Sequence, residues 1–299
     1  MKMKKIAAMV LAAAMLAGMT ACDNTTTEIV ESEPFYLELE NGEYRYHEYE
    51  DHIKIVKYSL FDSHVSIPKE INEKPVTEIG ELAFYQVNCD TLKSITVPDS
   101  VTKIGNLAFS CCDAVDIILP DTITEIGNEA FSRCYNLKSI KIPNSVTKIG
   151  KRAFDGCQSL TSVTIPSGVT EIECETFDNC QRLKNVIIPD GVTKIGDGAF
   201  NGCSSVTSMT LPNSVTEIGS RVFCNCYKMS NITLSDNVIV IGEEAFLYCG
   251  ALTNIVIPNG VTEIGDNAFK GCDNLESITY KGIEYPHSSH FYSAFRKGV

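Results

Sequence analysis

Phenylalanine recurs at an almost constant interval along most of the chain, and this period constrains the fold more than any other feature. The spacings are 25, then 22, then six times 23 residues, at Phe84, Phe109, Phe131, Phe154, Phe177, Phe200, Phe223, Phe246 and Phe269. An Ile-Gly pair keeps the same period and is replaced in one unit by Ile172-Glu173. So short a unit cannot bury its own apolar face, and successive units must stack in register around a continuous core. The sequence therefore predicts a solenoid.

The unit that ends at Phe154 illustrates the expected local structure. Residues 137–142 form a short β-branched run, and Pro143 ends it because proline cannot donate to a β ladder. Residues 146–149 form a second extended piece that ends at Gly150. Phe154 follows in a short helical or turn segment, and we expect its ring to fill the interior.

The segment from Cys134 to Phe154 has the pattern Cys-x-x-Leu-x-x-Ile-x-Ile-Pro-x-x-Val-Thr-x-Ile-Gly-x-x-Ala-Phe, and the chain resembles the BspA-like leucine-rich repeat family over about residues 53–283. The resemblance implies a leucine-rich-repeat-like solenoid, β-rich with short strands and short helical or turn segments, of about nine 23-residue repeats. Members of that family are typically exported and surface-associated, and several act in adhesion or host contact. The resemblance therefore implies a bacterial surface protein with such a role.

The first residues have the features of an export signal. Three lysines precede an uncharged apolar run at residues 6–19, which is too short to span a bilayer comfortably. Thr-Ala-Cys at residues 20–22 resembles the lipobox of bacterial lipoproteins, which implies that Cys22 becomes an acylated N-terminus. An ordinary secretory signal is the alternative. We expect an exported chain that a lipid anchor holds at the cell surface or in the cell envelope.

The same observations divide the chain into five segments. Residues 1–21 are the signal peptide, 22–34 a lipidated flexible tether, 35–75 N-terminal strands that cap the array, 76–280 the leucine-rich repeat solenoid, and 281–299 a C-terminal cap. A cap is expected at each end because an open solenoid exposes apolar surface and strand edges.

The chain has 13 cysteines, and most of them lie three residues after a repeat phenylalanine. Equivalent places in stacked turns predict an interior column of reduced thiols, each acting as a small hydrophobe, because parallel Cβ vectors do not favour disulfides. Cys111 and Cys112 compete for one place in this column. Cys174 and Cys224 lie outside it, and we expect them to be exposed and available for reaction or pairing.

A second column alternates in charge. The residues that precede Ile-Gly or Ile-Glu are Glu78, Lys103, Glu125, Lys148, Glu171, Lys194, Glu217, Val240 and Glu263. Stacked like charges would repel, whereas alternation gives weak ion pairs that a one-repeat slip would destroy. We interpret the column as a register device, with a binding stripe as the alternative.

Several classes of function are disfavoured. The net charge of −13 argues against nucleic acid as a partner, because phosphate binding needs a basic surface. All five histidines lie outside the regular array, and no nucleophile-elbow, zinc-protease or phosphate-loop motif occurs. We therefore predict no enzymatic activity, no cofactor and no metal.

The outward side chains of the strands are the candidate ligand surface. Two columns there consist mainly of serine, threonine and asparagine, and lysines cluster in the first half. The candidate binding residues are Lys93, Lys138, Lys141, Thr164, Lys184 and Thr210. We expect a monomeric chain whose favoured partner is an extracellular or surface protein. The lysines would contact an acidic patch of that protein, and the contact would serve adhesion. A glycan is the alternative, although stacking aromatics are missing from both columns, and an envelope scaffold without a soluble ligand is a third.

Overall fold

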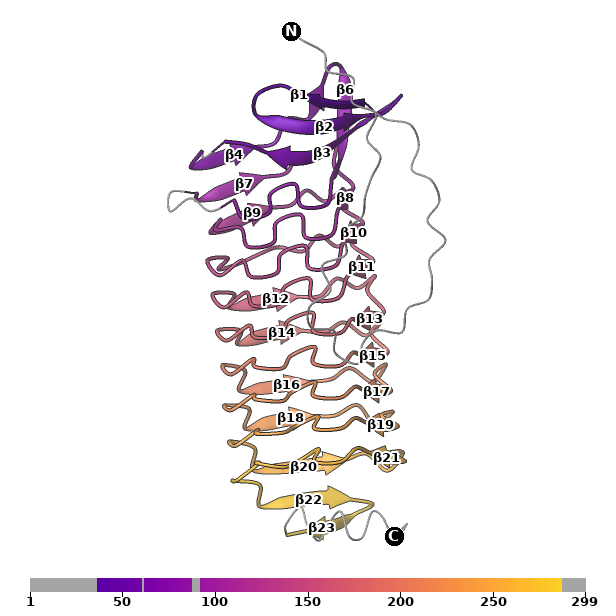
Figure 1. Ribbon diagram of the computed structural model, residues 1–299. Helices are drawn as coiled ribbons and strands as arrows, with labels where there is room; N and C mark the ends of the chain where they lie inside the picture. The colour runs from indigo at the N-terminus through magenta and orange to yellow at the C-terminus, as the bar shows by residue number, and fades with distance from the viewer. Residues whose placement is uncertain (1–36, 61, 88–91, 287–299) are drawn as a thin grey trace.

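The computed structural model describes residues 37–60, 62–87 and 92–286. The predicted signal peptide, the tether with Cys22, the first cysteine of the column (Cys89) and most of the predicted C-terminal cap lie outside these residues. The described chain is a β-solenoid whose turns stack along one axis, with the N-terminal strands at one end and β22 and β23 at the other (Figure 1).

Antiparallel strands open the solenoid. They are β1 (Leu37–Glu40), β2 (Tyr44–Glu48), β3 (Ile53–Tyr58), β5 (Glu70–Ile71) and β6 (Lys74–Ile79). The first three form a meander, β3 then pairs in parallel with β6, and β5 pairs antiparallel with β6. Buried tyrosines from β2 and β3 stack towards the first repeat phenylalanine, with Tyr58 and Phe84 centroids 5.2 Å apart.

One side of every repeat contributes a two-residue strand that ends at the Ile-Gly pair. These strands are β8 (Lys103–Ile104), β10 (Glu125–Ile126), β11 (Lys148–Ile149), β13 (Glu171–Ile172), β15 (Lys194–Ile195), β17 (Glu217–Ile218), β19 (Val240–Ile241) and β21 (Glu263–Ile264). We call this side the glycine edge. From β8 to β11 and from β13 to β21 these strands pair in parallel with no shift in register, so within each run every residue of the charge column lies beside the next one along the sequence.

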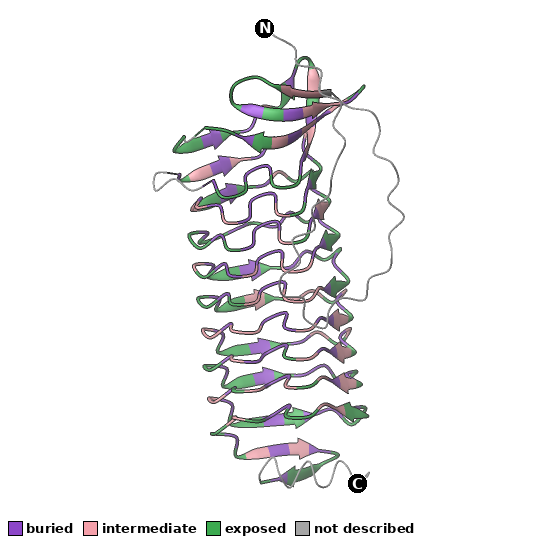
Figure 2. Ribbon diagram, viewed as in Figure 1, coloured by how far each residue is buried: buried purple, intermediate pink, exposed green. Residues whose placement is uncertain are grey.

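The other extended segment of each repeat forms the strand face. Its strands are β4 (His64–Ser66), β7 (Ser94–Thr96), β9 (Asp116–Ile118), β12 (Ser162–Thr164), β14 (Asn185–Ile187), β16 (Ser208–Thr210), β18 (Asn231–Thr233), β20 (Asn254–Ile257), β22 (Ser277–Tyr280) and β23 (Ile283–Tyr285). Strands pair in parallel and in register within four separate ladders, β4–β7–β9, β12–β14, β16–β18 and β20–β22, and β22–β23 is an antiparallel hairpin. Side chains alternate between buried and exposed along these strands (Figure 2).

The segment around each repeat phenylalanine is a turn, and the described residues include no helix. The residues two before and two after the phenylalanine have a positive φ, as Arg152 (φ 57°) and Gly156 (φ 70°) do around Phe154. Left-handed residues cannot continue a right-handed helix. Of the two alternatives that the sequence left open, helical segment or turn, the structure therefore has the turn.

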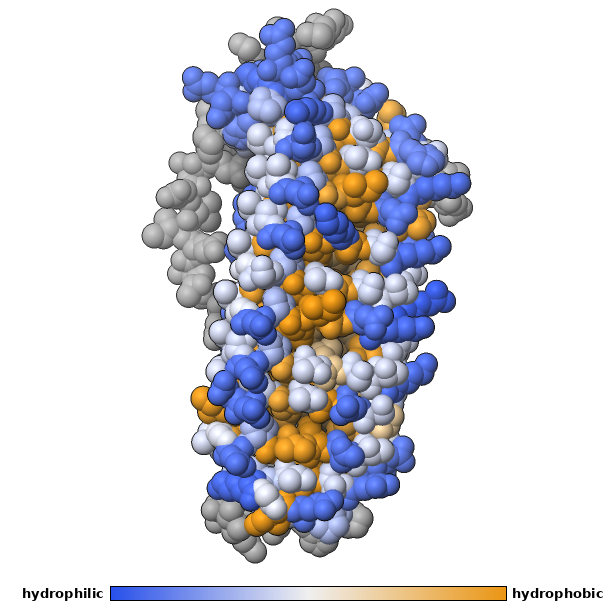
Figure 3. Space-filling model, turned by 180° about the vertical axis from the view of Figure 1, so that it is seen from behind, coloured by the Kyte–Doolittle hydropathy of each residue, from blue (hydrophilic) through white to orange (hydrophobic). Residues whose placement is uncertain are grey.

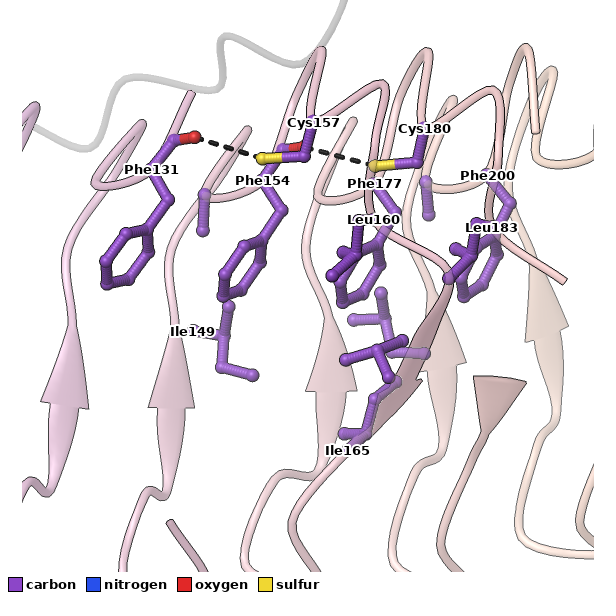
Figure 4. Packing of buried hydrophobic residues seen from close by; sticks show 14 of the residues in the cluster. Phe131, Ile149, Phe154, Cys157, Leu160, Ile165, Phe177, Cys180, Leu183 and Phe200 are labelled. Atoms are coloured by element: carbon purple, nitrogen blue, oxygen red, sulfur yellow. Dashed lines mark hydrogen bonds between the residues drawn. The ribbon is translucent and has the colours of Figure 1, made fainter. Parts of the chain in front are cut away.

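A continuous stack of phenylalanine rings runs along the interior. Neighbouring centroids lie 5.0 to 5.9 Å apart, and most ring planes are nearly parallel. The cysteine column runs beside it. From Cys134 onward each of its thiols donates to the carbonyl of a phenylalanine one turn back, as Cys157 Sγ does to Phe131 O and Cys180 Sγ to Phe154 O, both at 3.2 Å (Figure 4). The thiols thus satisfy carbonyl groups inside an apolar core.

Glycine is required on the glycine edge because adjacent turns come very close together there. A Cβ on Gly127, Gly150 or Gly242 would lie 2.4 to 2.7 Å from the backbone carbon of the glycine one turn earlier. Glu173 occupies this position in one turn, and the parallel ladder is interrupted there: β11 ends one sheet and β13 begins another. The side chain of Glu173 needs space that the close stacking elsewhere does not leave.

Candidate functional site

The structure places all six predicted binding residues on the exposed side of the solenoid. Lys141, Thr164 and Thr210 belong to the outward column of the strand face, which we call the central column: Thr96, Ile118, Lys141, Thr164, Ile187, Thr210, Thr233, Val256 and Thr279. Lys93, Lys138 and Lys184 are also exposed, and each lies three residues before a residue of the central column. One face therefore brings the six together, within the six turns from Thr96 to Thr210.

The lysines of this face differ in their surroundings. Lys141 Nζ lies 3.3 Å from Asp121 Oδ1, and both side chains are almost fully exposed, so this ion pair contributes little to stability. In the part of the chain that the structure describes, Lys93, Lys138 and Lys184 form no ion pair. Successive lysines of this row are two turns apart, and the row gives the first half of the face accessible positive charge.

Three exposed aliphatic residues on the same face are a further feature that sequence analysis did not single out. Ile118, Ile187 and Val256 are 55%, 61% and 64% exposed, although all three belong to strands. Their signal in the sequence was a β-branched residue at an outward position, where most repeats have threonine. They are single residues three turns apart rather than one contiguous patch, so their regular placement on one face, and not their exposure alone, distinguishes them.

The exposed aromatic residues lie elsewhere. Tyr135, Tyr227 and Tyr248 are each about half exposed, and they belong to the turns that follow the repeat phenylalanines. The hydroxyl of Tyr227 donates to Asn225 Oδ1 at 2.9 Å. The strand face itself has no aromatic side chain in its central column, as the sequence indicated.

The cysteine column is confirmed for the described residues, where every cysteine is a free thiol. Cys112 rather than Cys111 occupies the contested place, because Cys112 is fully buried and Cys111 is only partly so. Burial raises the pKa of the column thiols, as at Cys180 and Cys203, which keeps them protonated and unreactive.

The prediction for Cys224 is wrong. Its side chain is 5% exposed, and burial raises its pKa, whereas Cys174 is partly exposed. Cys224 directly follows a repeat phenylalanine, and its equivalents Ser110 and Ser132 are also buried. This position of the turn points into the protein, so a residue outside the main cysteine column can still be part of the core.

The alternating charge column forms ion pairs over much of its length. The Nζ atoms of Lys103, Lys148 and Lys194 lie 3.5, 3.4 and 3.0 Å from carboxylate oxygens of Glu125 or Glu217. The alternation of charge ends at Val240. A groove of about 410 Å³ lies on this part of the glycine edge, and several carboxylates line it, including that of Glu263. The predicted ion pairs are therefore present at these three lysines, and the role of the column in setting the register stays a prediction.

Two half-buried carboxylates lie in successive turns near the middle of the solenoid. Burial, followed by the negative charges of Asp155 and Glu175, raises the pKa of Asp178 to about 7. Asn201 Nδ2 donates to Asp178 Oδ1 at 2.8 Å and partly offsets this effect. Burial also raises the pKa of Asp155, while nearby Arg133 and Arg152 lower it. Sequence analysis did not identify this pair.

The described residues contain neither a metal-ligand cluster nor a membrane helix. No three or more His, Cys, Asp or Glu side chains are grouped there in a way that could hold a metal ion. None of these residues forms a helix long and apolar enough to cross a bilayer.

The surface turned away from the viewer in Figure 1 carries an apolar band that runs along the length of the solenoid between hydrophilic borders (Figure 3).

The chain belongs to the family described as BspA type leucine rich repeat region, whose sequence pattern matches residues 54–184 and 170–295 in 6 copies. This confirms the resemblance inferred from the repeat unit. No curated protein matches the chain.

Solved structures of bacterial leucine-rich repeat proteins share the fold. A leucine rich cell surface protein from Faecalibacterium prausnitzii is 24% identical, with a TM-score of 0.52 and coverage of 87% of this chain and 97% of that one. A leucine rich repeat protein from T. pallidum is 23% identical, with a TM-score of 0.52 and coverage of 88% and 96%. The pneumococcal vaccine antigen PcpA is 21% identical, with a TM-score of 0.50 and 81% of each chain covered. At these identities the likeness shows the fold alone.

Proposed function

We propose that this protein is a surface-anchored bacterial lipoprotein that recognises other proteins through its strand face, in adhesion to host or microbial surface proteins. The observation that carries the proposal is the combination of accessible lysines with exposed aliphatic side chains on one regular face. Apolar contacts supply affinity when they are buried, and a row of like charge selects an oppositely charged partner. Membership of a family with many surface proteins supports the same role.

The face has the dimensions of a protein-binding surface rather than of a small-molecule pocket. Its outward side chains are mostly short, so it is an open strip along the stack, about 40 Å long at a strand spacing of about 4.8 Å. Small ligands bind in concave, largely enclosed sites, whereas open surfaces of this size suit macromolecules. The lysine row would contact carboxylates of the partner.

A binding screen against extracellular-matrix proteins and a glycan array tests this role, using the chain and the double variant Lys138→Glu/Lys141→Glu. We expect the chain to bind one or more proteins, and the double variant to weaken binding at least tenfold. The matched control is Lys228→Glu/Lys270→Glu, which makes the same charge change at exposed turn residues. Equal losses of binding affinity in both double variants would show that the strand face is not the binding surface. Absence of binding to both the matrix proteins and the glycans would contradict adhesion to host or microbial proteins.

Glycan binding is the second candidate, and the exposed Tyr227 and Tyr248 favour it because they provide the aromatic surface that the strand face lacks. The same array distinguishes the two roles. Binding only to glycans, lost on Tyr227→Ala/Tyr248→Ala and retained in Lys138→Glu/Lys141→Glu, would replace protein recognition with glycan recognition.

Anchoring through Cys22 is tested separately. A lipidated chain in the native bacterium should incorporate a labelled fatty acid and fractionate with membranes, and Cys22→Ala should lose the label. A labelled Cys22→Ala chain would contradict the lipoprotein assignment, while an unlabelled chain that is still exported would indicate an ordinary secretory signal.

A further inference from the structure

The exposed aliphatic residues of the strand face are regularly spaced. Ile118, Ile187 and Val256 are separated by 69 residues in each interval, which is three repeats of 23. At a strand spacing of about 4.8 Å they lie about 14 Å apart along the solenoid. They form a line of apolar contacts along the middle of the face, with threonines and Lys141 between them.

Opposite charges lie on the two sides of this line. On one side, three residues before the central column, are Lys93, Lys138 and Lys184. On the other side, three residues after it, are the aspartates Asp99, Asp121, Asp190 and Asp236. Asp121 already reaches Lys141 of the next turn at 3.3 Å, which shows that this row is close to the face. The strand face thus has lysines along one border, three aliphatic residues among threonines and Lys141 at its centre, and aspartates along the other border.

Such a face is complementary to itself when one copy is rotated by 180° about an axis parallel to the solenoid. This rotation keeps each turn at its own height and exchanges the two borders. Ile118, Ile187 and Val256 then meet the same residues of the second copy. Lys93 meets Asp99 of the second copy, and Lys184 meets Asp190.

On the axis Lys141 meets Lys141 of the second copy, and each of these ammonium groups has Asp121 of its own chain as a counter-charge at 3.3 Å. At the borders the remaining turns add no like-charge contact. The border pairs are Val115 with Asp121, Lys138 with Asn144, Thr161 with Ser167, Thr207 with Asn213, Ser230 with Asp236, Thr253 with Asn259 and Glu276 with Gly282. The antiparallel arrangement is less favourable, because it brings Lys184 against Lys184 and Asp190 against Asp190. Twofold symmetric dimers require this kind of self-complementary surface.

We propose that the strand face binds the strand face of a second copy of this chain in a parallel, twofold-symmetric dimer centred on the line from Ile118 to Val256. This proposal rests on the proposed function, because it names the partner of the same face. Both N-termini of the dimer point the same way, as two chains anchored in one membrane would. The dimer is therefore a lateral contact between neighbours on one cell.

The size of the face sets the strength of the contact. A strip about 16 Å wide and about 40 Å long buries on the order of 600 Å² on each copy, or about 1,200 Å² in total, at the lower limit of stable interfaces. We expect dissociation at low micromolar concentrations and dimers at the high local concentration of a membrane surface. Lys184 and Asp190 form no ion pair within the described residues of one copy, so both can pair across the axis.

Charge exchange at one border pair tests the arrangement. Sedimentation equilibrium of the purified chain over about 10 to 500 μM should show a monomer–dimer equilibrium. Lys184→Asp and Asp190→Lys should each weaken it at least tenfold, since each creates like-charge pairs on both sides of the axis. An equimolar mixture of these two variants should associate again, because each then meets its opposite.

The double variant Lys184→Asp/Asp190→Lys distinguishes the two orientations. Alone it should dimerise like the unaltered chain in either orientation. Mixed with the unaltered chain it should form no heterodimer if the copies are parallel, because like charges then meet at both border positions, and should form one if they are antiparallel, because opposite charges then meet. Ile187→Ser should also weaken the dimer, whereas Ile239→Ser, an exposed aliphatic residue of the glycine edge, should not. The mixture and the double variant keep the test decisive even if a single variant were unstable.

The outcomes separate this inference from the proposed function. A chain that remains monomeric at 500 μM, or single variants without effect, would overturn the dimer, and adhesion would then stand on the protein-binding screen alone. Dimerisation that charge exchange restores, together with no binding in that screen, would uphold the dimer. The strand face would then bind only a second copy of this chain.

Discussion

At the scale of single residues, the fold depends on positions where a side chain is either indispensable or impossible. Phe154 and its equivalents fill the interior, and the thiols beside them donate to carbonyl groups that no water can reach. On the opposite side, the glycine edge excludes even a methyl group. Each repeat therefore requires a large side chain, phenylalanine, in the interior and the smallest residue, glycine, at the glycine edge. Both requirements keep the spacing between successive turns constant.

Gly242→Ala should destabilise the protein severely. The added Cβ would lie 2.4 Å from Gly219 C and 2.5 Å from Ser220 N, and backbone atoms cannot move aside as a flexible side chain can. We expect a loss of about 3 kcal/mol in the free energy of unfolding, typical of overpacking in a rigid site. Chemical denaturation measures it. Gly260→Ala is the control, because its Cβ would lie 3.7 Å from the nearest atom, and an equal loss there would contradict the steric explanation.

Asp178→Asn should stabilise the protein above neutral pH. The pKa of Asp178 is raised to about 7 in the folded state, and about 3.9 is usual for an unfolded chain. The folded state therefore binds the proton more tightly, and the stability that protonation provides is lost as the pH rises through this window. Asparagine does not titrate, so its advantage should be largest at pH 8 and vanish near pH 4.

Unfolding curves of both proteins at several pH values test this prediction. The exposed Asp236 supplies a matched control, since Asp236→Asn should give no comparable pH-dependent gain. A stability difference between Asp178→Asn and the unaltered chain that is constant from pH 4 to pH 8 would show that burial of the charge is not its cause.

At the scale of the repeat element, the sequence predicted what the period determines. The columns of phenylalanine, cysteine and alternating charge follow from counting, because stacked turns of equal length place equivalent residues side by side. The left-handed turns could not be predicted, since Leu107 and Glu129 adopt a positive φ although neither residue type favours it. Cys224 was misplaced for a related reason: whether a turn position points inward depends on that backbone geometry.

The strand face was predicted as a surface but not as a pattern. Lys93, Lys138 and Lys184 were recognised because they are charged, whereas Ile118 and Ile187 were not singled out, since β-branched residues are ordinary in strands. Their significance depends on how far they are exposed and on their position relative to the lysines and aspartates across the same face. Only the three-dimensional arrangement gives that information.

Glu173 should locally weaken the glycine edge. The amides of Thr193 and Gly196 donate to the turn before them, at 2.9 and 2.7 Å, but no such backbone bond joins Thr170 or Glu173 to the preceding turn among the described residues. We therefore expect Thr170 and Glu173 to exchange their amide hydrogens at least tenfold faster than Thr193 and Gly196. Equal protection of all four amides in native-state hydrogen exchange would mean that the ladder is continuous in solution.

At the scale of the whole molecule, the solenoid is a linear array in which each turn contacts only its neighbours, and its glycine-edge ladder is interrupted at Glu173 while the hydrogen bonds of the phenylalanine turns continue across. Stability in such arrays is close to a sum of terms for each repeat and each interface. A defect should therefore be felt nearby and not across this interruption, and the chain should behave as two blocks that share one phenylalanine stack.

Phe223→Ala tests this division. Removing a fully buried ring should cost about 3–5 kcal/mol in the turns that contact it. We expect hydrogen-exchange protection to fall in β15, β17 and β19, and to change little in β8, β10 and β11. Phe109→Ala should give the reverse pattern. A uniform loss of protection over both blocks in either variant would show instead that the phenylalanine stack transmits stability across Glu173, and that the solenoid unfolds as a single cooperative unit.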